Sequence, residues 1–87
     1  MADLHLPSTL TPLFAGLPRQ VDIEAATVAE AIDGLDLRFP GVRDRLCEPG
    51  PELRGHIHVY VDRERASLET PLDVRSRIDV IAAISGG

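Results

Sequence analysis

The sequence predicts an α+β fold in which a mixed β-sheet carries one main helix on one face. Two observations lead to this prediction: several short segments alternate polar and apolar residues, and one amphipathic helical segment lies between them. The order of elements is strand, strand, helix, strand, short strand and strand, which packs into two layers around one core. With 87 residues, the chain has room for a single domain spanning residues 1–87.

The first two strands are predicted where the alternation of polar and apolar residues begins. Residues 3–6 and 20–24 both alternate, so Val21 and Ile23 are expected to point inward. Pro7 ends the first strand, and the Ser, Thr and Pro residues at 8–12 predict a loop. Three apolar residues after this loop are expected to fold back against the core: Leu13, Phe14 and Leu17.

The main helix has the clearest signal in the chain. Thr27, followed three residues later by Glu30, forms a capping box at its start, and Pro40-Gly41 ends it. One apolar stripe at helical spacing gives its buried side: Val28, Ala31, Ile32, Leu35 and Phe39. A short helical turn is expected at residues 42–46, followed by a loop at residues 48–52.

The remaining strands follow that loop. Residues 56–61 place three β-branched residues on one face and His56, His58 and Tyr60 on the other, where His5 is expected to join them. Residues 62–64 turn the chain, and residues 70–72 mark another connection. The last strand is predicted at residues 78–82.

The histidines of this face could in principle bind a metal. His56 and His58 are two residues apart on one strand, as two ligands would be, but no further Cys or Asp spacing completes a site. We therefore expect no metal centre and favour an exposed sheet face open to a partner protein.

The charge balance excludes a nucleic-acid binder. The net charge is −5, and all nine basic residues are arginine, whereas binding to a phosphate backbone needs a basic surface. Residues 1–37 account for the whole excess of negative charge. Such an acidic half could steer a basic protein partner, but a solvated acidic surface is the simpler interpretation.

The chain is expected to be a cytoplasmic protein that does not enter a membrane. No apolar run approaches the roughly 20 residues that span a bilayer, and the first residues do not resemble a signal peptide. The single cysteine, Cys47, cannot form an intrachain disulfide. Because Cys47 lies beside Glu48, which opposes a lowered thiol pKa, we interpret it as an incidental thiol rather than a nucleophile.

The last three residues, Ser85, Gly86 and Gly87, form a predicted flexible tail beyond the final strand. When extended, three residues reach about 10 Å. Glycine lacks a Cβ, so a Gly-Gly end can pass down a narrow channel in another protein. A free α-carboxylate, with a pKa of about 3.5, is a poor electrophile and reacts only after activation. These properties suit a protein whose own carboxyl group is a substrate.

Residues along the whole chain resemble the small sulfur carriers of the MoaD/ThiS type. The ending Val80-Ile81-Ala82-Ala83-Ile84-Ser85-Gly86-Gly87 is similar to that family's last strand and diglycine, and residues 71–78 align with its Pro-Leu-x-x-Gly-Asp-x-Val segment. Residues 39–46 and 57–62 are similar to the cysteine-biosynthesis branch. Two departures stand out: Arg75-Ser76 replaces Gly-Asp, and Ala82-Ala83 replaces a pair that contains proline.

The resemblance implies a ubiquitin-like β-grasp fold and a carrier function rather than an enzyme. A ubiquitin-activating-like adenylyltransferase would adenylate Gly87 with its own ATP and magnesium, and a persulfide or sulfide source would convert it to a thiocarboxylate. A synthase would then accept the sulfur, for cysteine, molybdopterin or another metabolite. The alternative is a ubiquitin-like modifier conjugated through Gly86-Gly87, although the absence of lysine excludes lysine-linked chains of this protein.

The partner enzymes would dock beside the tail. Alternation along the last strand places Ile81 on the open face of the sheet, where an exposed β-branched residue fits a docking patch as well as it fits an ordinary surface. The other candidate docking residues are Ile84, His58, Ala82 and Ala83.

Overall fold

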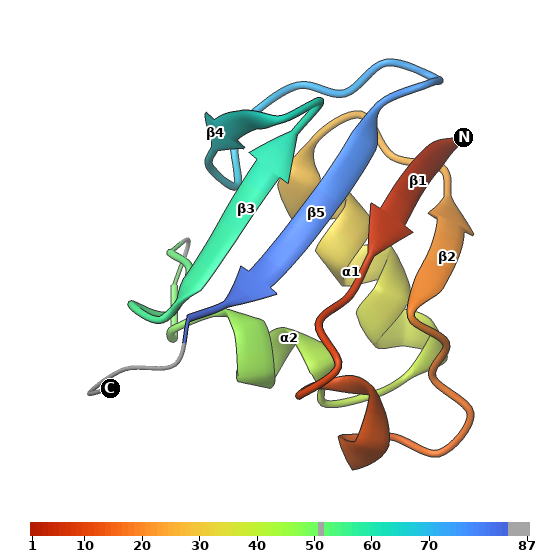
Figure 1. Ribbon diagram of the computed structural model, residues 1–87, viewed down its shortest axis with the longest axis vertical. Helices are drawn as coiled ribbons and strands as arrows, with labels where there is room; N and C mark the ends of the chain where they lie inside the picture. Colours follow the sequence, from red (N-terminus) through yellow and green to blue (C-terminus); the bar gives the residue numbers. More distant parts are fainter. Residues whose placement is uncertain (51, 84–87) are drawn as a thin grey trace.

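The computed structural model describes residues 1–50 and 52–83 of the chain. The helical and strand elements follow in the order β1 (Ala2–His5), the 3-10 helix η1 (Thr11–Leu13), β2 (Gln20–Ile23), α1 (Val28–Arg38), α2 (Val42–Leu46), β3 (Ile57–Val61), β4 (Glu64–Ala66) and β5 (Arg77–Ala82). This order is the predicted one, and Figure 1 shows the α+β arrangement that results.

The five strands form one mixed sheet in the order β2-β1-β5-β3-β4. Strands β1 and β5 run parallel, with Leu4 opposite Ile78, and all other neighbours are antiparallel. The last strand of the sequence therefore lies in the middle of the sheet, as Figure 1 shows. Because β1 pairs with residues 77–79 and β3 pairs with residues 78–82, β5 keeps at least one partner up to the point where the chain leaves the sheet.

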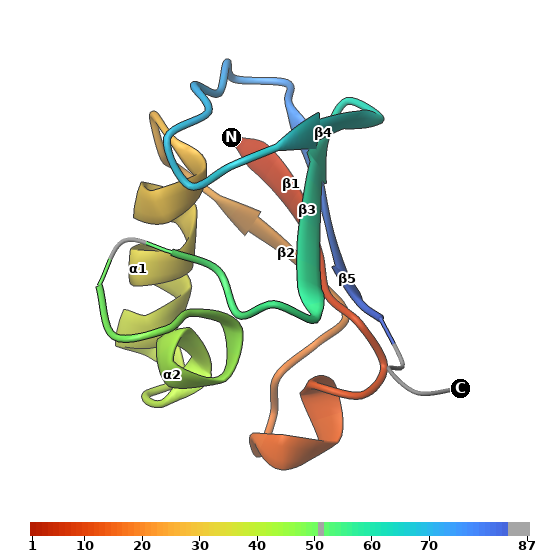
Figure 2. The same ribbon diagram turned by 90° about the vertical axis from the view of Figure 1, so that its left-hand side faces the viewer.

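Helix α1 covers one face of this sheet, and no helix formed by residues 1–50 or 52–83 lies over the opposite face (Figure 2). The predicted capping at its start is present, since the Glu30 N–H donates to Thr27 Oγ1 at 3.2 Å. Four of the five predicted stripe residues, Val28, Ala31, Ile32 and Leu35, are buried. The fifth, Phe39, ends the helix and packs partly buried against the same core. The prediction of one main helix on one face is confirmed.

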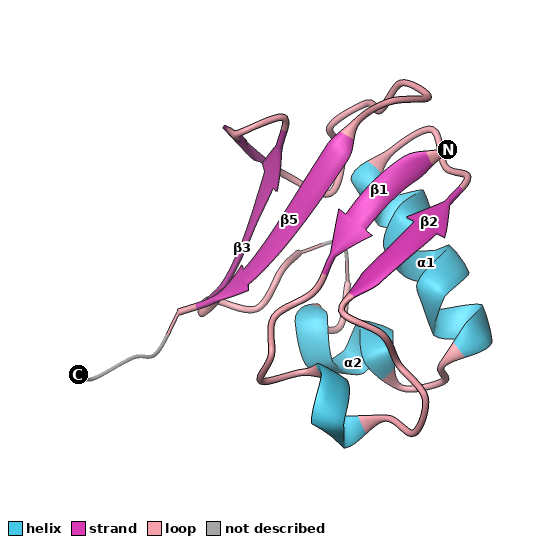
Figure 3. Cartoon of the chain, turned by 45° about the vertical axis from the view of Figure 1, so that its right-hand side comes forward, coloured by secondary structure: helices cyan, strands magenta, loops and turns pink. Residues whose placement is uncertain are grey.

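The segment between β1 and β2 differs from the prediction. Leu17 is buried and Phe14 packs against the core, but Leu13 is 53% exposed, so its expected burial is wrong. Leu10 is buried in its place. Between these two residues lies the short 3-10 helix η1, visible beneath the sheet in Figure 3, which begins directly after Leu10 and ends at Leu13.

The turn before β5 is held by side chains rather than by glycine. The buried Ser76 accepts a hydrogen bond from the Asp73 N–H through its Oγ at 2.9 Å, and Asp73 Oδ1 accepts one from the Arg75 N–H at 2.8 Å. Arg75 and Ser76 are not among the residues with positive φ. With Arg75-Ser76 in place of the family's Gly-Asp, this turn is therefore held by hydrogen bonds of Asp73 and Ser76 and needs no left-handed residue.

Within the described residues, no helix has the length and apolar character that crossing a membrane requires.

Candidate functional site

The site is built around the point where β5 leaves the sheet. Beyond Ala82, the Ala83 N–H donates to the backbone oxygen of His56 at 2.7 Å, which fixes the last described residue against the start of β3. Figure 1 shows that this point lies at the end of the sheet next to α2, far from the N-terminus. Whatever follows Ala83 in the sequence therefore starts from a fixed position on the molecule.

Four of the predicted site residues lie outside the described residues: Ile84, Ser85, Gly86 and Gly87. Their roles as docking residue, tail and reactive terminus remain predictions.

The open face of the sheet carries the first pair of predicted docking residues. Ile81 is 47% exposed and lies directly opposite His58 in the antiparallel pairing of β5 with β3. Because residues directly opposite in a sheet share a face, their side chains are neighbours. The prediction that Ile81 lies on the open face is confirmed, and it has a histidine beside it.

The prediction that His56 shares the open face with His58 is wrong. His58 Nδ1 lies 2.8 Å from Arg65 Nη2, so the guanidinium donates and Nδ1 accepts. His56 precedes β3 and lines a separate groove. Among residues 1–50 and 52–83, no group of three metal-ligating side chains gathers.

Charged pairs surround Ile81 on the open face. His5 Nε2 lies within hydrogen-bond distance of Asp3 Oδ2, at 2.8 Å, and Gln20 Nε2 donates to the same carboxylate at 2.9 Å. The hydrogen bond from His5 is the largest cause that holds the pKa of Asp3 below its ordinary value. On β5, Asp79 accepts hydrogen bonds from the Arg77 guanidinium, which raises the pKa of Arg77. His5 lies on this face as predicted, and the carboxylates of Asp3 and Asp79 on this face both have hydrogen-bond partners.

A shallow concavity of about 800 Å³ lies beside Ile81 on this face, between β5 and the segment that follows β1. His5, Tyr60 and Asp79 line it with Ile81, so it combines one exposed apolar side chain with hydrogen-bonding groups. Such a surface suits recognition by a protein rather than deep enclosure of a small ligand.

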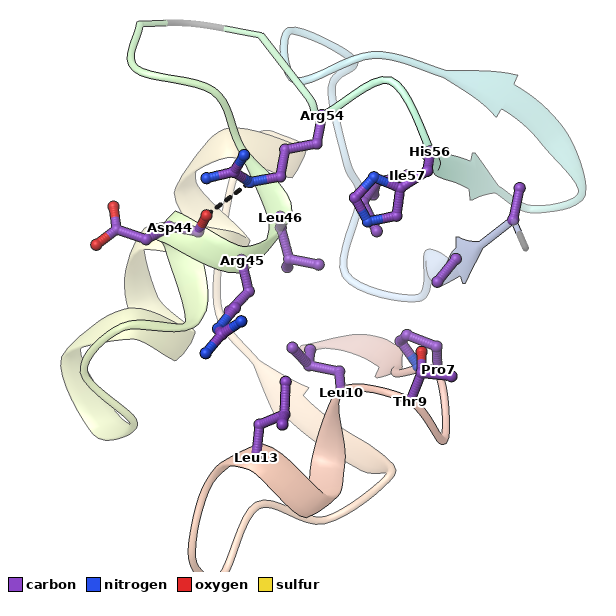
Figure 4. Close-up of a pocket in the computed structure, with 12 residues that line it drawn as sticks. Pro7, Thr9, Leu10, Leu13, Asp44, Arg45, Leu46, Arg54, His56 and Ile57 are labelled. Carbon is purple, nitrogen blue, oxygen red and sulfur yellow. Dashed lines mark hydrogen bonds between the residues drawn. The ribbon is translucent and has the colours of Figure 1, made fainter. Parts of the chain in front are cut away.

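The other predicted docking residues, Ala82 and Ala83, line a second groove of about 480 Å³ (Figure 4). This groove lies at the end of the sheet, between α2, the segment around η1 and the start of β3. The predicted docking residues therefore lie on two adjoining surfaces at the chain exit, and Ala82 lines both of them. Sequence reasoning missed the groove, because its walls come from segments as distant as Leu10, Arg45 and Ile57.

Cys47 is 3% exposed and belongs to the core. Burial is the main cause that raises the pKa of its thiol, so the nucleophilic thiolate is disfavoured at neutral pH. This agrees with its interpretation as an incidental thiol and gives the physical reason.

Comparison with known proteins agrees with this geometry. The model of the ThiS family matches residues 13–87. No curated protein matches the sequence. A chain in the crystal structure of the Amycolatopsis orientalis BexX/CysO complex is 26% identical, with a TM-score of 0.87 and full coverage of both chains.

Two further solved structures share the fold. CysO of Mycobacterium tuberculosis, described as an antigen, has 21% identity, a TM-score of 0.86, and coverage of 97% of this chain and 100% of the other. SAMP1 of Haloferax volcanii, a small archaeal modifier protein, has 26% identity, a TM-score of 0.82, and coverage of 99% and 98%. These likenesses identify the sheet and helix described above as a ubiquitin-like β-grasp fold.

Proposed function

The chain belongs to the ThiS family, and from that premise we propose that it is a sulfur carrier protein whose Gly87 carboxyl group becomes a thiocarboxylate. The observation that carries the proposal is the position of β5. Strand β5, paired with β3 as far as Ala82, brings the chain to a fixed exit at Ala83, beside two adjoining surfaces to which an enzyme could bind. The four residues from Ile84 to Gly87 could extend up to about 14 Å from that exit.

The proposed chemistry takes place on an activating enzyme. The Gly87 carboxylate attacks the α-phosphorus of ATP, pyrophosphate leaves, and a mixed anhydride with AMP forms. Hydrosulfide then attacks the acyl carbon and AMP leaves, which gives the thiocarboxylate. A persulfide would instead give an acyl disulfide, from which a thiol releases the same product. ATP and magnesium belong to the activating enzyme, and this chain supplies the carboxyl group.

The chain's own residues have a docking role in this scheme. The pair of Ile81 and His58 offers the activating enzyme an apolar contact rimmed by polar groups. Gly86 and Gly87, which lack a Cβ, would let the backbone pass through a narrow channel toward ATP. The carrier is then a cytoplasmic substrate of two enzymes and catalyses neither step. We favour a cysteine precursor as the acceptor of its sulfur, following the resemblance of residues 39–46 and 57–62.

The direct test is intact-mass spectrometry after incubation with the activating enzyme, Mg-ATP and sulfide. We expect a gain of about 16 Da, for sulfur replacing oxygen, and no gain when ATP is omitted. Deleting Gly87 should abolish the gain. Gly55→Ala should preserve it, because a methyl group at Gly55 meets no atom within 4 Å. An unchanged mass in the wild-type protein would reject the proposed carrier chemistry.

A second function, conjugation to other proteins, is favoured by the likeness to SAMP1, a modifier protein. The same adenylate would then be attacked by an amine of a target protein. Conjugates on a denaturing gel, lost on deletion of Gly86-Gly87, would support the modifier; a thiocarboxylate without conjugates would support the carrier.

A further inference from the structure

A groove of about 590 Å³ lies at the end of the sheet opposite the chain exit. The start of β1, the segment after β2, the first turn of α1 and the segment before β5 line it. Met1 and Val74, which are 62% and 73% exposed, bring large apolar side chains to its surface, and the half-buried Leu72 adds a third. This distal groove therefore presents apolar surface to solvent, where a partner could cover it.

Hydrogen bonds join the walls of the distal groove. The Leu72 N–H donates to the backbone oxygen of Ala26 at 2.8 Å, which ties the segment before β5 to the segment after β2. The Met1 ammonium group donates to the backbone oxygen of Val74 at 2.9 Å, so this cation is already engaged. Because segments distant in the sequence are joined, the groove is formed before anything binds, which lowers the entropic cost of binding.

The rim of the distal groove is acidic. Glu24, Glu30 and Asp73 line it, and the described lining residues include no Arg, Lys or His. Glu24 and Glu30 take part in none of the side-chain ion pairs found among residues 1–50 and 52–83. Asp73 Oδ1 accepts the Arg75 N–H, but the guanidinium of Arg75 is not part of the lining. The rim therefore attracts positive charge.

The start of α1 does not offset this preference by attracting anions. The N–H groups of Val28 and Ala29 donate to backbone oxygens of the connection between β4 and β5, and that of Glu30 donates to Thr27 Oγ1. Within the described part of the chain, an anionic ligand would thus find neither an unused N–H at the helix start nor a basic side chain in this groove.

We propose that the distal groove binds a basic segment of another protein. A large aliphatic side chain of that segment lies against Val74 and Leu72, and the Lys or Arg residues that flank it pair with Glu24 and Glu30. Charge complementarity selects this occupant over a second copy of the chain, because two distal grooves facing each other would bring their carboxylates together.

This partner is distinct from the activating enzyme of the proposed function, which docks at the chain exit. The six residues of β5 separate the distal groove from the exit by about 20 Å. A segment bound in the distal groove leaves the exit uncovered, so one protein could hold the carrier while an enzyme modifies its end. The binding itself does not depend on the proposed function.

The test is solution NMR of the full chain with a blocked peptide, acetyl-Lys-Arg-Leu-Leu-Arg-Lys-amide. We expect the peptide to shift the amide signals of residues 24–26, 30 and 72–74, at about 150 mM salt, where exposed charges more than about 8 Å apart are largely screened. A peptide with serine in place of both leucines should bind about tenfold more weakly, because it cannot fill the apolar surface.

Two kinds of variant separate the apolar from the charged contribution. Val74→Lys should weaken binding of the leucine peptide about tenfold, whereas Leu37→Lys, at an exposed apolar residue in the last turn of α1, should not. Glu24→Gln together with Glu30→Gln should weaken it about fivefold, and glutamine at position 30 keeps the capping pattern. Glu64→Gln, on the edge strand β4, is the matched control.

The absence of any shift at about 1 mM peptide would overturn the proposal. Equal binding of the serine peptide would reduce the groove to a general attraction for cations and also overturn it. Shifts centred on Ile81 and Ala83 would assign the peptide to the exit surfaces instead. Shifts of the same groove signals on dilution of the chain alone would assign the groove to a second copy. Because no activation is needed, the result remains decisive even if the wild-type protein gains no sulfur.

Discussion

The two faces of β5 are built from different residues for different purposes. On the helix-facing side, Ile78 and Val80 are 0% and 4% exposed and belong to the core. On the open side, Asp79 is half-buried and Ile81 is 47% exposed. The comparison teaches that one strand can fix the fold through one row of side chains while the other row stays available for recognition.

The largest expected effect is on stability and concerns the helix-facing row. Ile78→Ala should lower the free energy of unfolding by about 2–5 kcal/mol, because it removes buried methyl groups and leaves a cavity. Ile81→Ala should change the free energy of unfolding by no more than about 0.5 kcal/mol. Urea unfolding of both variants measures the contrast. An equal loss of unfolding free energy in both variants would contradict the proposed difference between the two faces of β5.

The second effect concerns binding to a partner enzyme, for which Ile81 should matter more than Ile78. Ile81→Asp should weaken binding to the activating enzyme about tenfold, or about 1.4 kcal/mol, by placing a charge in an apolar contact. Titration calorimetry with the folded variant measures this affinity. Val74→Asp is the matched control, since Val74 is also exposed but precedes the start of β5 at the end opposite Ala83. Unchanged affinity in Ile81→Asp would remove the open face from the docking surface.

The smallest effect concerns the charges of the open face. The pKa of Asp3 is lowered from 3.8, so its carboxylate stabilises the folded chain above that pH and loses this contribution as the pH falls through the lower folded value. Asp3→Asn should therefore be less stable than the wild type at pH 6, with the difference shrinking toward pH 2. Urea midpoints across this range measure the change. Glu69→Gln, at an exposed carboxylate in the connection between β4 and β5, should show no comparable convergence.

Local patterns predicted what depends on local geometry. Thr27 and the apolar stripe after it fixed the start and the buried side of α1, because capping and helical spacing act within a few residues. Alternation placed Ile81 on the open face for the same reason. Leu13 was misplaced because a 3-10 helix of three residues is too short to show a period.

The groove could not be predicted from the sequence. Leu10, Arg45, Ile57 and Ala83 meet only because β5 enters the middle of the sheet and its end lies next to α2. His56 was misassigned by one position at a strand end, which moved it from the open face to the groove. Features assembled from distant segments need the tertiary arrangement.

The burial of Cys47 has a practical consequence for chemical labelling. A thiol-selective alkylating reagent applied to the native protein would find the sole cysteine sulfur enclosed in the core and predominantly protonated. A thiocarboxylate at the chain end would be the more ionised nucleophile, because a thiocarboxylic acid is a much stronger acid than a cysteine thiol. The two sulfur atoms would therefore differ in reactivity. A fluorescent alkylating dye would label the carrier that bears a thiocarboxylate and leave the carrier with a free carboxylate unlabelled.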